Sequence, residues 1–210
     1  MENPVMILGA SALGMVALDT FQSNGVIVYG FLDDDPKLHK TEIGGVTVLG
    51  STDDEGYTKL IGKKCEAFVA VDDPKYRKSL VEMLNEERHV MPVNAIHATA
   101  VVSATATFGH GNLIGPGVVI NTKARVGSHV LLHAKALVDY GAEVGDFVQV
   151  GAGSIIGAGS RIEDGAFIGA GAVVVAGITV GKNARVGAGS VVIEAVAARA
   201  TVFGNPAKGV

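Results

Sequence analysis

The sequence predicts two structural parts, a small α/β domain over residues 1–92 and a parallel β-solenoid over residues 93–210. Before about residue 92, short apolar runs alternate with amphipathic stretches, as in units of strand, helix and strand. From Ile96 to Val192, by contrast, an aliphatic or aromatic residue recurs at every sixth position. The period changes at Met91–Asn94 with no long linker, so the domain boundary is expected there.

The first domain opens as a strand, a helix and a second strand, and continues with two more of each element. A glycine-containing turn follows the first strand, and the last helix is amphipathic, with Leu80, Met83 and Leu84 on one side. These elements predict a small parallel sheet accompanied by helices. The expected strands are Val5–Leu8, Val26–Leu32, Val46–Leu49 and Ala67–Val71, and the expected helices are Met15–Phe21, Asp53–Leu60 and Lys75–Glu86.

The second domain is defined by its period of six, which fits neither an isolated helix nor a strand with two distinct faces. Each hexad is therefore expected to be one short strand plus a corner, and three hexads to close one triangular coil. Residues 18 apart then stack on successive coils. The seventeen apolar rungs are Ile96, Val102, Phe108, Ile114, Ile120, Val126, Leu132, Val138, Val144, Val150, Ile156, Ile162, Ile168, Val174, Val180, Val186 and Val192.

The positions beside the rungs are also restricted. Small residues two positions before most rungs suit a narrow solenoid interior, and glycine often follows a rung directly, where we expect backbone dihedrals that favour glycine. Polar residues replace glycine at several of these corners, where a neighbouring solenoid or a ligand can reach them. They include His97, Asn121, His133, Asp139 and Glu163. The tail Thr201–Lys208 is expected to cap the last coil.

Composition excludes several classes of function. The net charge of -4 and the pI of 5.8, with scattered cations, argue against a nucleic-acid partner. The single cysteine, Cys65, excludes an internal disulfide and a multi-cysteine metal site. No run approaches 18 apolar residues, so membrane insertion is not expected, and the N-terminus lacks the features of a signal peptide. These observations predict a cytoplasmic protein.

The repeated segments Gly169–Val174 (GAGAVV) and Gly187–Val192 (GAGSVV), with the ending Gly204–Lys208 (GNPAK), resemble the left-handed β-helix hexapeptide acyltransferases. The segments Gly9–Gly14 (GASALG) and Phe31–Asp34 (FLDD) narrow the resemblance to the PglD/NeuD-like sugar acyltransferases, with a Rossmann-like N-terminal domain. The resemblance implies a homotrimer that moves an acetyl group from acetyl-CoA to the amine or hydroxyl of a nucleotide-linked sugar for surface-glycan synthesis. The active site would lie between adjacent β-helices.

Physical reasoning favours the trimer independently, because flat apolar faces are usually buried by symmetric association and a cyclic trimer is the simplest closure. A cleft between two β-helices would suit an extended thioester. Stacked corners with small residues offer backbone amides along such a cleft, and one such column runs through His133, Gly151, Gly169 and Gly187. The residues assigned to the cofactor are Gln149, Gly151, Ala170 and Ala188.

The catalytic position departs from the family pattern. In these relatives a histidine deprotonates the acceptor and a following carboxylate raises its basicity, but here Tyr140 and Gly141 occupy those places. Gln149 stands where relatives usually have a second histidine near the thioester. A free tyrosine titrates at about pH 10, so a phenol is a poor base at neutral pH.

Three interpretations remain open. His133 of one subunit can act as the base beside Tyr140 of its neighbour, with Asp139 orienting it. An amine acceptor can react with little general base if positioning supplies part of the rate. The protein can also be a catalytically impaired relative that binds a nucleotide sugar or serves as a scaffold. The sequence does not decide between N- and O-acylation.

The first domain carries the expected substrate residues. Gly9–Gly14 can cradle a phosphate at a helix N-terminus, which assigns Ser11, Ala12 and Leu13 to the substrate, although relatives have Gly-His in place of Ala12-Leu13. Asp33 and Asp34 follow the second strand, where an acidic residue meets a ribose or base. A solvated acidic loop and an NAD site are the alternatives. No metal is expected, because His97 and His133 would stand two coils, or about 9.5 Å, apart.

Overall fold

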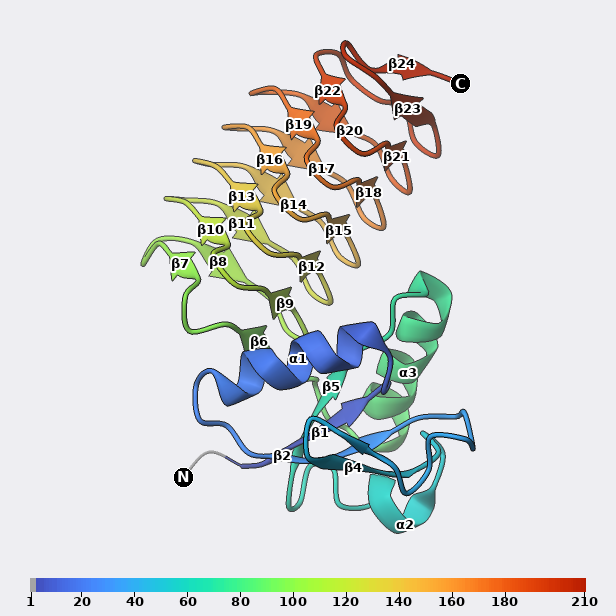
Figure 1. Cartoon of the computed structure of the whole chain (residues 1–210). Helices are drawn as coiled ribbons and strands as arrows, with labels where there is room; N and C mark the ends of the chain where they lie inside the picture. The colour runs from blue at the N-terminus through green and yellow to red at the C-terminus, as the bar shows by residue number, and fades with distance from the viewer. Residues whose placement is uncertain (1–2) are drawn as a thin grey trace. The chain divides into compact units, whose positions relative to one another are not determined.

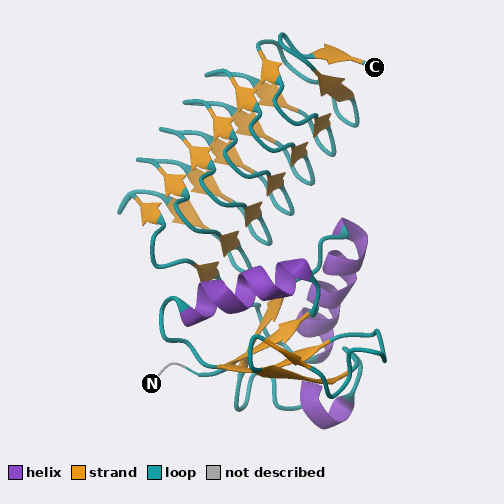
Figure 2. Cartoon of the chain, viewed as in Figure 1, coloured by secondary structure: helices purple, strands orange, loops and turns teal. Residues whose placement is uncertain are grey.

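The computed structural model describes residues 3–210 and divides into two compact units, Met1–Ala98 and Thr99–Val210 (Figure 1). Figure 2 shows that the helices all belong to the first unit and that the second unit consists of short strands joined by loops. Within residues 3–210, no helix combines the length and apolar composition needed to cross a bilayer.

The first unit is a five-stranded sheet with helices packed on it, as the sequence predicts. The strand order is β3-β4-β2-β1-β5, and β1, β2, β4 and β5 run parallel. Helix α1 packs on β1 and β2, and α3 packs on β5. The elements are β1 (Val5–Leu8), α1 (Ala12–Gln22), β2 (Val28–Leu32), β3 (Glu42–Ile43), β4 (Val46–Gly50), α2 (Glu55–Thr58), β5 (Glu66–Val69), α3 (Pro74–Glu87) and β6 (Ala95–Ile96).

Several bounds in this unit differ from the sequence prediction, and two differences are larger. Strand β3 was not expected, and it pairs antiparallel with β4 across a tight turn at Gly44 and Gly45, both at positive φ. The sheet is therefore not wholly parallel. Helix α2 begins later than the expected Asp53, because Asp54, whose side chain accepts from the Gly56 N–H, caps its start, and it ends at Thr58 instead of Leu60.

The second unit is a parallel β-helix of two-residue strands. Sheet I is β7-β10-β13-β16-β19-β22, sheet II is β8-β11-β14-β17-β20, and sheet III runs β9-β12-β15-β18-β21-β23-β24. The strands are β7 (Val101–Val102), β8 (Thr107–Phe108), β9 (Leu113–Ile114), β10 (Val119–Ile120), β11 (Arg125–Val126), β12 (Leu131–Leu132), β13 (Leu137–Val138), β14 (Glu143–Val144), β15 (Gln149–Val150), β16 (Ile155–Ile156), β17 (Arg161–Ile162), β18 (Phe167–Ile168), β19 (Val173–Val174), β20 (Thr179–Val180), β21 (Arg185–Val186), β22 (Val191–Val192), β23 (Thr201–Phe203) and β24 (Lys208–Gly209).

The predicted ladder is confirmed. Each rung is the second residue of a strand, and every rung from Ile114 to Val192 is buried. Residues 18 apart pair in register, as Leu137 does with Ile155. Ser154, one of the small interior residues, is fully buried and donates from Oγ to the Gly169 carbonyl at 2.8 Å. This bond satisfies a hydroxyl that would otherwise be costly to bury.

Glycine follows the rungs for a different reason from the one expected. A positive φ occurs at the third corner residue, such as Lys135 or Gly141, and not at the residue directly after the rung. At that first position the coils approach closely, so that a Cβ on Gly151 would lie 2.5 Å from the Ala170 nitrogen. Steric contact with the next coil, rather than dihedral preference, selects glycine there.

The C-terminal tail closes the end of the β-helix, as predicted. Strand β23 pairs in parallel with β21, and β24 folds back antiparallel on β23. The Ala207 N–H donates to the Val191 carbonyl at 2.8 Å, which ties the tail to sheet I as well. The tail thereby satisfies backbone groups that would otherwise form exposed sheet edges.

Candidate active site

The predicted catalytic residues lie on two different corners of one coil. His133 opens the corner between sheets III and I, which we call corner III–I, and Asp139 and Tyr140 open the corner between sheets I and II, called corner I–II. Strand β13 of sheet I separates the two corners. Within one chain, therefore, His133 does not meet Tyr140.

On corner I–II, the carboxylate of Asp139 is held in a fixed orientation. Its Oδ1 accepts from Asn121 Nδ2 at 3.0 Å and from the Tyr140 N–H at 2.7 Å. The side chain of Tyr140 is 52% exposed and extends from the same corner. The corner thus presents an oriented carboxylate beside an exposed phenol.

The structure places His133 and the four residues assigned to the cofactor on or beside corner III–I. Gln149 Nε2 lies 3.1 Å from His133 Nε2. Gly151 follows on the next coil, and Ala170 and Ala188 continue the column. Among residues 3–210, no acceptor reaches the backbone N–H groups of Ala170 and Ala188, and the glycines below them leave these groups uncovered.

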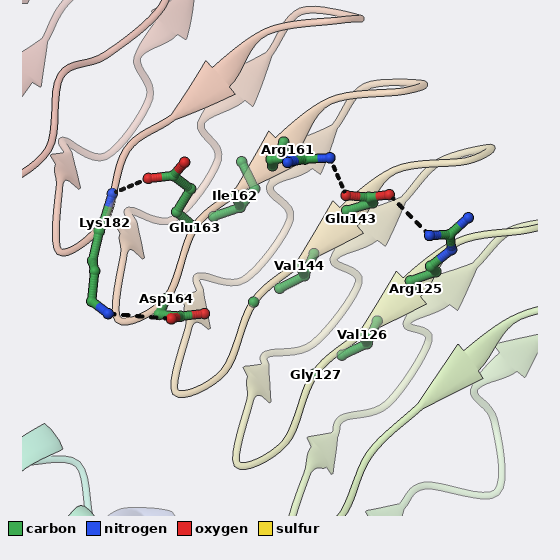
Figure 3. Close-up of a pocket in the computed structure, with 11 residues that line it drawn as sticks. Arg125, Val126, Gly127, Glu143, Val144, Arg161, Ile162, Glu163, Asp164 and Lys182 are labelled. Atoms are coloured by element: carbon green, nitrogen blue, oxygen red, sulfur yellow. Dashed lines mark hydrogen bonds and ion pairs between the residues drawn. The ribbon is translucent and has the colours of Figure 1, made fainter.

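A groove of about 500 Å³ on sheet II was not anticipated from the sequence (Figure 3). Glu143 forms ion pairs with Arg125 at 3.3 Å and Arg161 at 2.8 Å, on the strands below and above it. Lys182 donates from its backbone to Glu163 and pairs through Nζ with Asp164. The sequence signal for this groove is a set of charged residues spaced 18 apart. Because these charges pair with one another, they neutralise one another within the groove.

In the first unit, the turn after β1 lies at the carboxyl edge of the sheet, between the ends of β2 and β5. Gly9 is required there, because its φ is +109° and a Cβ would lie 2.4 Å from the Ala70 carbonyl oxygen. Ser11 is the N-cap of α1 but makes no capping bond with its side chain. Ala12 is exposed, whereas the Leu13 side chain is buried, so Leu13 can offer a ligand only its backbone.

The two aspartates after β2 are engaged with the protein itself. Asp33 Oδ2 accepts from the Ala10 N–H at 2.7 Å, which anchors the glycine turn. Asp34 Oδ1 accepts from both the backbone N–H and the hydroxyl of Thr52 at 2.8 Å, and its Oδ2 accepts from the Tyr76 hydroxyl. Thr52 and Tyr76 were missed in the sequence because only the fold brings the end of β4 and helix α3 to this carboxylate.

These contacts shift two acid–base equilibria. Burial acts to raise the pKa of Asp34, but the hydrogen bonds from Tyr76 and Thr52 outweigh it and hold that pKa below its usual value. Burial, together with the hydrogen bond to Asp34, raises the pKa of Tyr76 to about 12. Asp34 is therefore ionised and Tyr76 neutral at physiological pH. Within residues 3–210, no group of three or more His, Cys, Asp or Glu side chains is arranged to hold a metal ion.

Comparison with known proteins identifies the family. Residues 4–84 match the PglD N-terminal domain, and residues 123–158 and 160–194 match the hexapeptide repeat of succinyl-transferase. A His-to-Ala variant of GDP-perosamine N-acetyl transferase from Caulobacter crescentus, in complex with CoA and GDP-perosamine, is 30% identical with a TM-score of 0.90, over 99% of this chain and 96% of its own. This chain belongs to the PglD-like hexapeptide-repeat sugar acyltransferases.

Two other solved structures agree with this assignment. The acetyltransferase domain of PglB from Neisseria gonorrhoeae, in complex with acetyl coenzyme A, is 26% identical over 100% of both chains, with a TM-score of 0.92. WeeI from Acinetobacter baumannii is 27% identical over 99% of both chains, with a TM-score of 0.84. The fold is thus a Rossmann-like domain followed by a left-handed parallel β-helix. A search of curated protein sequences finds no match.

For a PglD-like acyltransferase, corner I–II offers an oriented carboxylate and a phenol, and corner III–I offers the imidazole of His133. His133 is the side chain of the column that can serve as a general base, while Asp139 can orient a positively charged or donating group. The backbone N–H groups of Ala170 and Ala188 can donate hydrogen bonds to the carbonyl oxygens of an extended ligand. His133 and Asp139 lie on different corners. A site that uses both residues therefore requires corner III–I and corner I–II to come together.

Proposed function

We propose that this chain transfers an acetyl group from acetyl-CoA to a nucleotide-linked sugar, as an N- or O-acetyltransferase of surface-glycan synthesis. The observation that carries the proposal is the column on corner III–I, where His133 and Gln149 precede the uncovered amides of Ala170 and Ala188. The solved relatives bound to CoA with GDP-perosamine, and to acetyl coenzyme A, support both ligands.

The proposal includes a homotrimer. The outward side chains of sheet I are all apolar, and Val101 and Ile155 are 62% and 39% exposed. The full set is Val101, Val119, Leu137, Ile155, Val173 and Val191. Because corners III–I and I–II flank sheet I, three copies packed through this face around one axis would bring corner III–I of each copy to corner I–II of the next. His133 would then meet Asp139 and Tyr140 of the neighbouring subunit.

In this arrangement, the acceptor amine or hydroxyl attacks the thioester carbonyl carbon and passes its proton to neutral His133. The bond from carbon to the acceptor atom forms, the tetrahedral intermediate collapses with cleavage of the C–S bond, and the departing thiolate recovers the proton from the imidazolium. Asp139 of the adjacent copy orients the acceptor. Tyr140 lines the cleft.

We assign the nucleotide to the first unit. The uncapped N-terminus of α1, with Ser11, Ala12 and Leu13, offers backbone N–H groups to phosphate. Asp33 and Asp34 shape this edge through the bonds to Ala10, Thr52 and Tyr76, so their role includes positioning the binding loops. The expected compartment is the cytoplasm, since Cys65 is a free thiol, as is usual in reducing surroundings.

A second candidate function is a catalytically impaired, nucleotide-sugar-binding or scaffold protein. The observation that favours it is the exposed Tyr140 at the place of the expected base. The two candidates differ in turnover and not in binding.

The deciding experiment follows thiol release from acetyl-CoA with a panel of UDP- and GDP-linked amino sugars and their hydroxyl counterparts. We expect turnover with at least one sugar, and a loss of about 100- to 10,000-fold in kcat for His133→Ala, because the general base is removed. Thr179→Ala, on sheet II, is the matched control. Sugar binding without turnover would establish the scaffold function, and unchanged turnover in His133→Ala would remove His133 as the base.

A further inference from the structure

The column on corner III–I ends at an exposed aromatic ring. Phe203 is the last residue of β23, and its side chain is 55% exposed. It lies over the column, because a Cβ built on Gly187 would stand 2.8 Å from the Phe203 Cβ. Gly187 directly precedes Ala188, the last residue of the column. A flat aromatic surface therefore meets solvent where the line of backbone donors stops.

The side chain of Lys208 stands beside this ring. Strand β24 pairs antiparallel with β23, and Lys208 is the direct partner of Phe203 in that pair (Figure 1). Residues directly opposite in an antiparallel pair carry their side chains on the same face, close enough to interact. Both residues are exposed, and within residues 3–210 no carboxylate pairs with the Lys208 ammonium. The ring and an unpaired cation thus face solvent together.

A second cation, Arg185, lies on the same outer face, on the adjacent strand β21. It pairs in register with Thr201 of β23, two residues before Phe203. Its guanidinium carbon lies 4.7 Å from the centroid of the Phe167 ring, and this cation–π contact restrains the side chain. In the described part of the chain no acid neutralises the guanidinium, so its N–H donors are available to an anion.

The chemistry of this cluster matches one end of coenzyme A. Beyond the pantetheine arm, CoA carries a diphosphate, a flat adenine base and a ribose 3′-phosphate. Aromatic side chains stack on bases, and guanidinium and ammonium groups bind phosphate oxygens. The position of the cluster at the end of the column favours CoA over the sugar nucleotide, which we assign to the first unit.

We propose that Phe203, Arg185 and Lys208 bind the nucleotide end of the acyl-CoA donor and select it over donors that end at phosphopantetheine. The inference rests on the proposed function for the identity of the donor. Arg185 belongs to the coil of Ala188, so it takes the diphosphate next to the pantetheine arm. Phe203 stacks on the adenine. Lys208 lies beyond the ring, on the side away from β21, and takes the 3′-phosphate.

The first test separates the base from the rest of the cofactor. Calorimetry on the full-length protein measures Kd for CoA, for dephospho-CoA, which lacks the 3′-phosphate, and for 4′-phosphopantetheine, which lacks the adenosine. Phe203→Leu keeps the Cβ and an apolar side chain but removes the ring. It should weaken CoA and dephospho-CoA by about 5- to 100-fold and leave phosphopantetheine unchanged. Phe203→Trp keeps an aromatic ring and should bind CoA as tightly as the native chain.

The second test separates the two cations. Lys208→Gln should weaken CoA by about 2- to 5-fold, as expected for an exposed ion pair, and leave dephospho-CoA unchanged. Arg185→Gln should weaken all three ligands, since each carries a phosphate next to the pantetheine arm. The matched control is Arg199→Gln, which removes the same charge from an exposed residue before β23, at the opposite corner of sheet III, and should change no Kd. Thermal unfolding of each variant checks that the fold is intact.

The outcomes distinguish this site from the proposed reaction. Phe203→Leu with a native Kd for CoA, or with CoA and phosphopantetheine weakened equally, would overturn the inference, as would a native protein that binds no CoA. The expected ligand discrimination in a protein that turns over no sugar would support the site and refute the proposed acyl transfer. An active enzyme whose KM for acetyl-CoA is the same in Phe203→Leu would retain the proposed function and refute the site.

Discussion

Asp34 holds three segments together with a single carboxylate. It follows the end of β2, and it accepts hydrogen bonds from Thr52 after β4 and from Tyr76 on α3. A carboxylate that accepts several hydrogen bonds is stabilised in its ionised form, which agrees with the lowered pKa. The loops around the proposed nucleotide site are therefore ordered before any ligand arrives.

Tyr76→Phe should lower the free energy of unfolding by about 1 kcal/mol at pH 7, because it removes one hydrogen bond to a charged acceptor at a partly exposed site. The raised pKa of Tyr76 stabilises the fold below the value of about 10 for a free phenol, and this stabilisation disappears as the pH rises through about 12. The deficit of the variant should therefore shrink above pH 10. Urea unfolding at pH 7 and pH 11 measures it, and an equal deficit at both would contradict this account.

The lowered pKa of Asp34 makes the stability of the fold depend on pH in the opposite direction. Its contribution is present above the ordinary aspartate value of about 3.9 and is lost as the pH falls through the lowered value. Tyr76→Phe should consequently begin to unfold at higher pH on acid titration than the native protein. Circular dichroism between pH 5 and pH 2 records the midpoint, which should be unchanged if Tyr76 does not stabilise the ionised carboxylate.

At the level of the structural element, the corner column depends on glycine for close contact between coils. Gly151 and Gly169 lie under the amides of Ala170 and Ala188, and a Cβ on either would meet the next backbone at 2.5 Å. Gly159, by contrast, has a positive φ of 64° and open space around its Cβ position. The same residue type is thus required for two different physical reasons on one β-helix.

Gly151→Ala should destabilise the protein by about 1–3 kcal/mol through overpacking of backbone against backbone, and should raise KM for acetyl-CoA by covering the Ala170 amide. The matched control is Gly159→Asn, because asparagine tolerates the left-handed region and meets nothing there. Thermal unfolding and KM are measured for both. Equal effects of the two substitutions would show that close approach is not the constraint at position 151.

For the molecule as a whole, we expect sheet I to determine the assembly. Leu137 lies at the centre of its apolar face, between Val119 and Ile155 on the adjacent coils. Sheet II, in contrast, carries paired charges on its outer side, which remain favourable in water. We expect the native chain to sediment as a trimer.

Leu137→Glu should shift the sedimentation coefficient to that of a single chain, because a buried unpaired carboxylate is costly at an apolar interface. It should also abolish turnover, since the proposed site needs corners from two copies. Thr179→Glu on sheet II should leave the trimer intact. A native protein that sediments as one chain would refute both the trimer and the shared site.

Much of the fold was predictable because the signal is periodic. The rung positions, the stacking of residues 18 apart and the capping tail all follow from a repeat in which each hexad has the same shape. The short β3 was missed because two residues carry no usable period. The reason for glycine after the rungs was also misassigned, since close approach between coils is invisible in one dimension.

The sequence by itself determined the α/β unit, the β-helix, the family resemblance and the absence of histidine at Tyr140, because each of these depends on residue type and spacing along the chain. Only the tertiary structure decided which side chains form hydrogen bonds with one another. The contact of Gln149 with His133 and the three bonds to Asp34 join segments from different strands or coils. Their formation depends on side-chain geometry and local packing, which spacing does not encode.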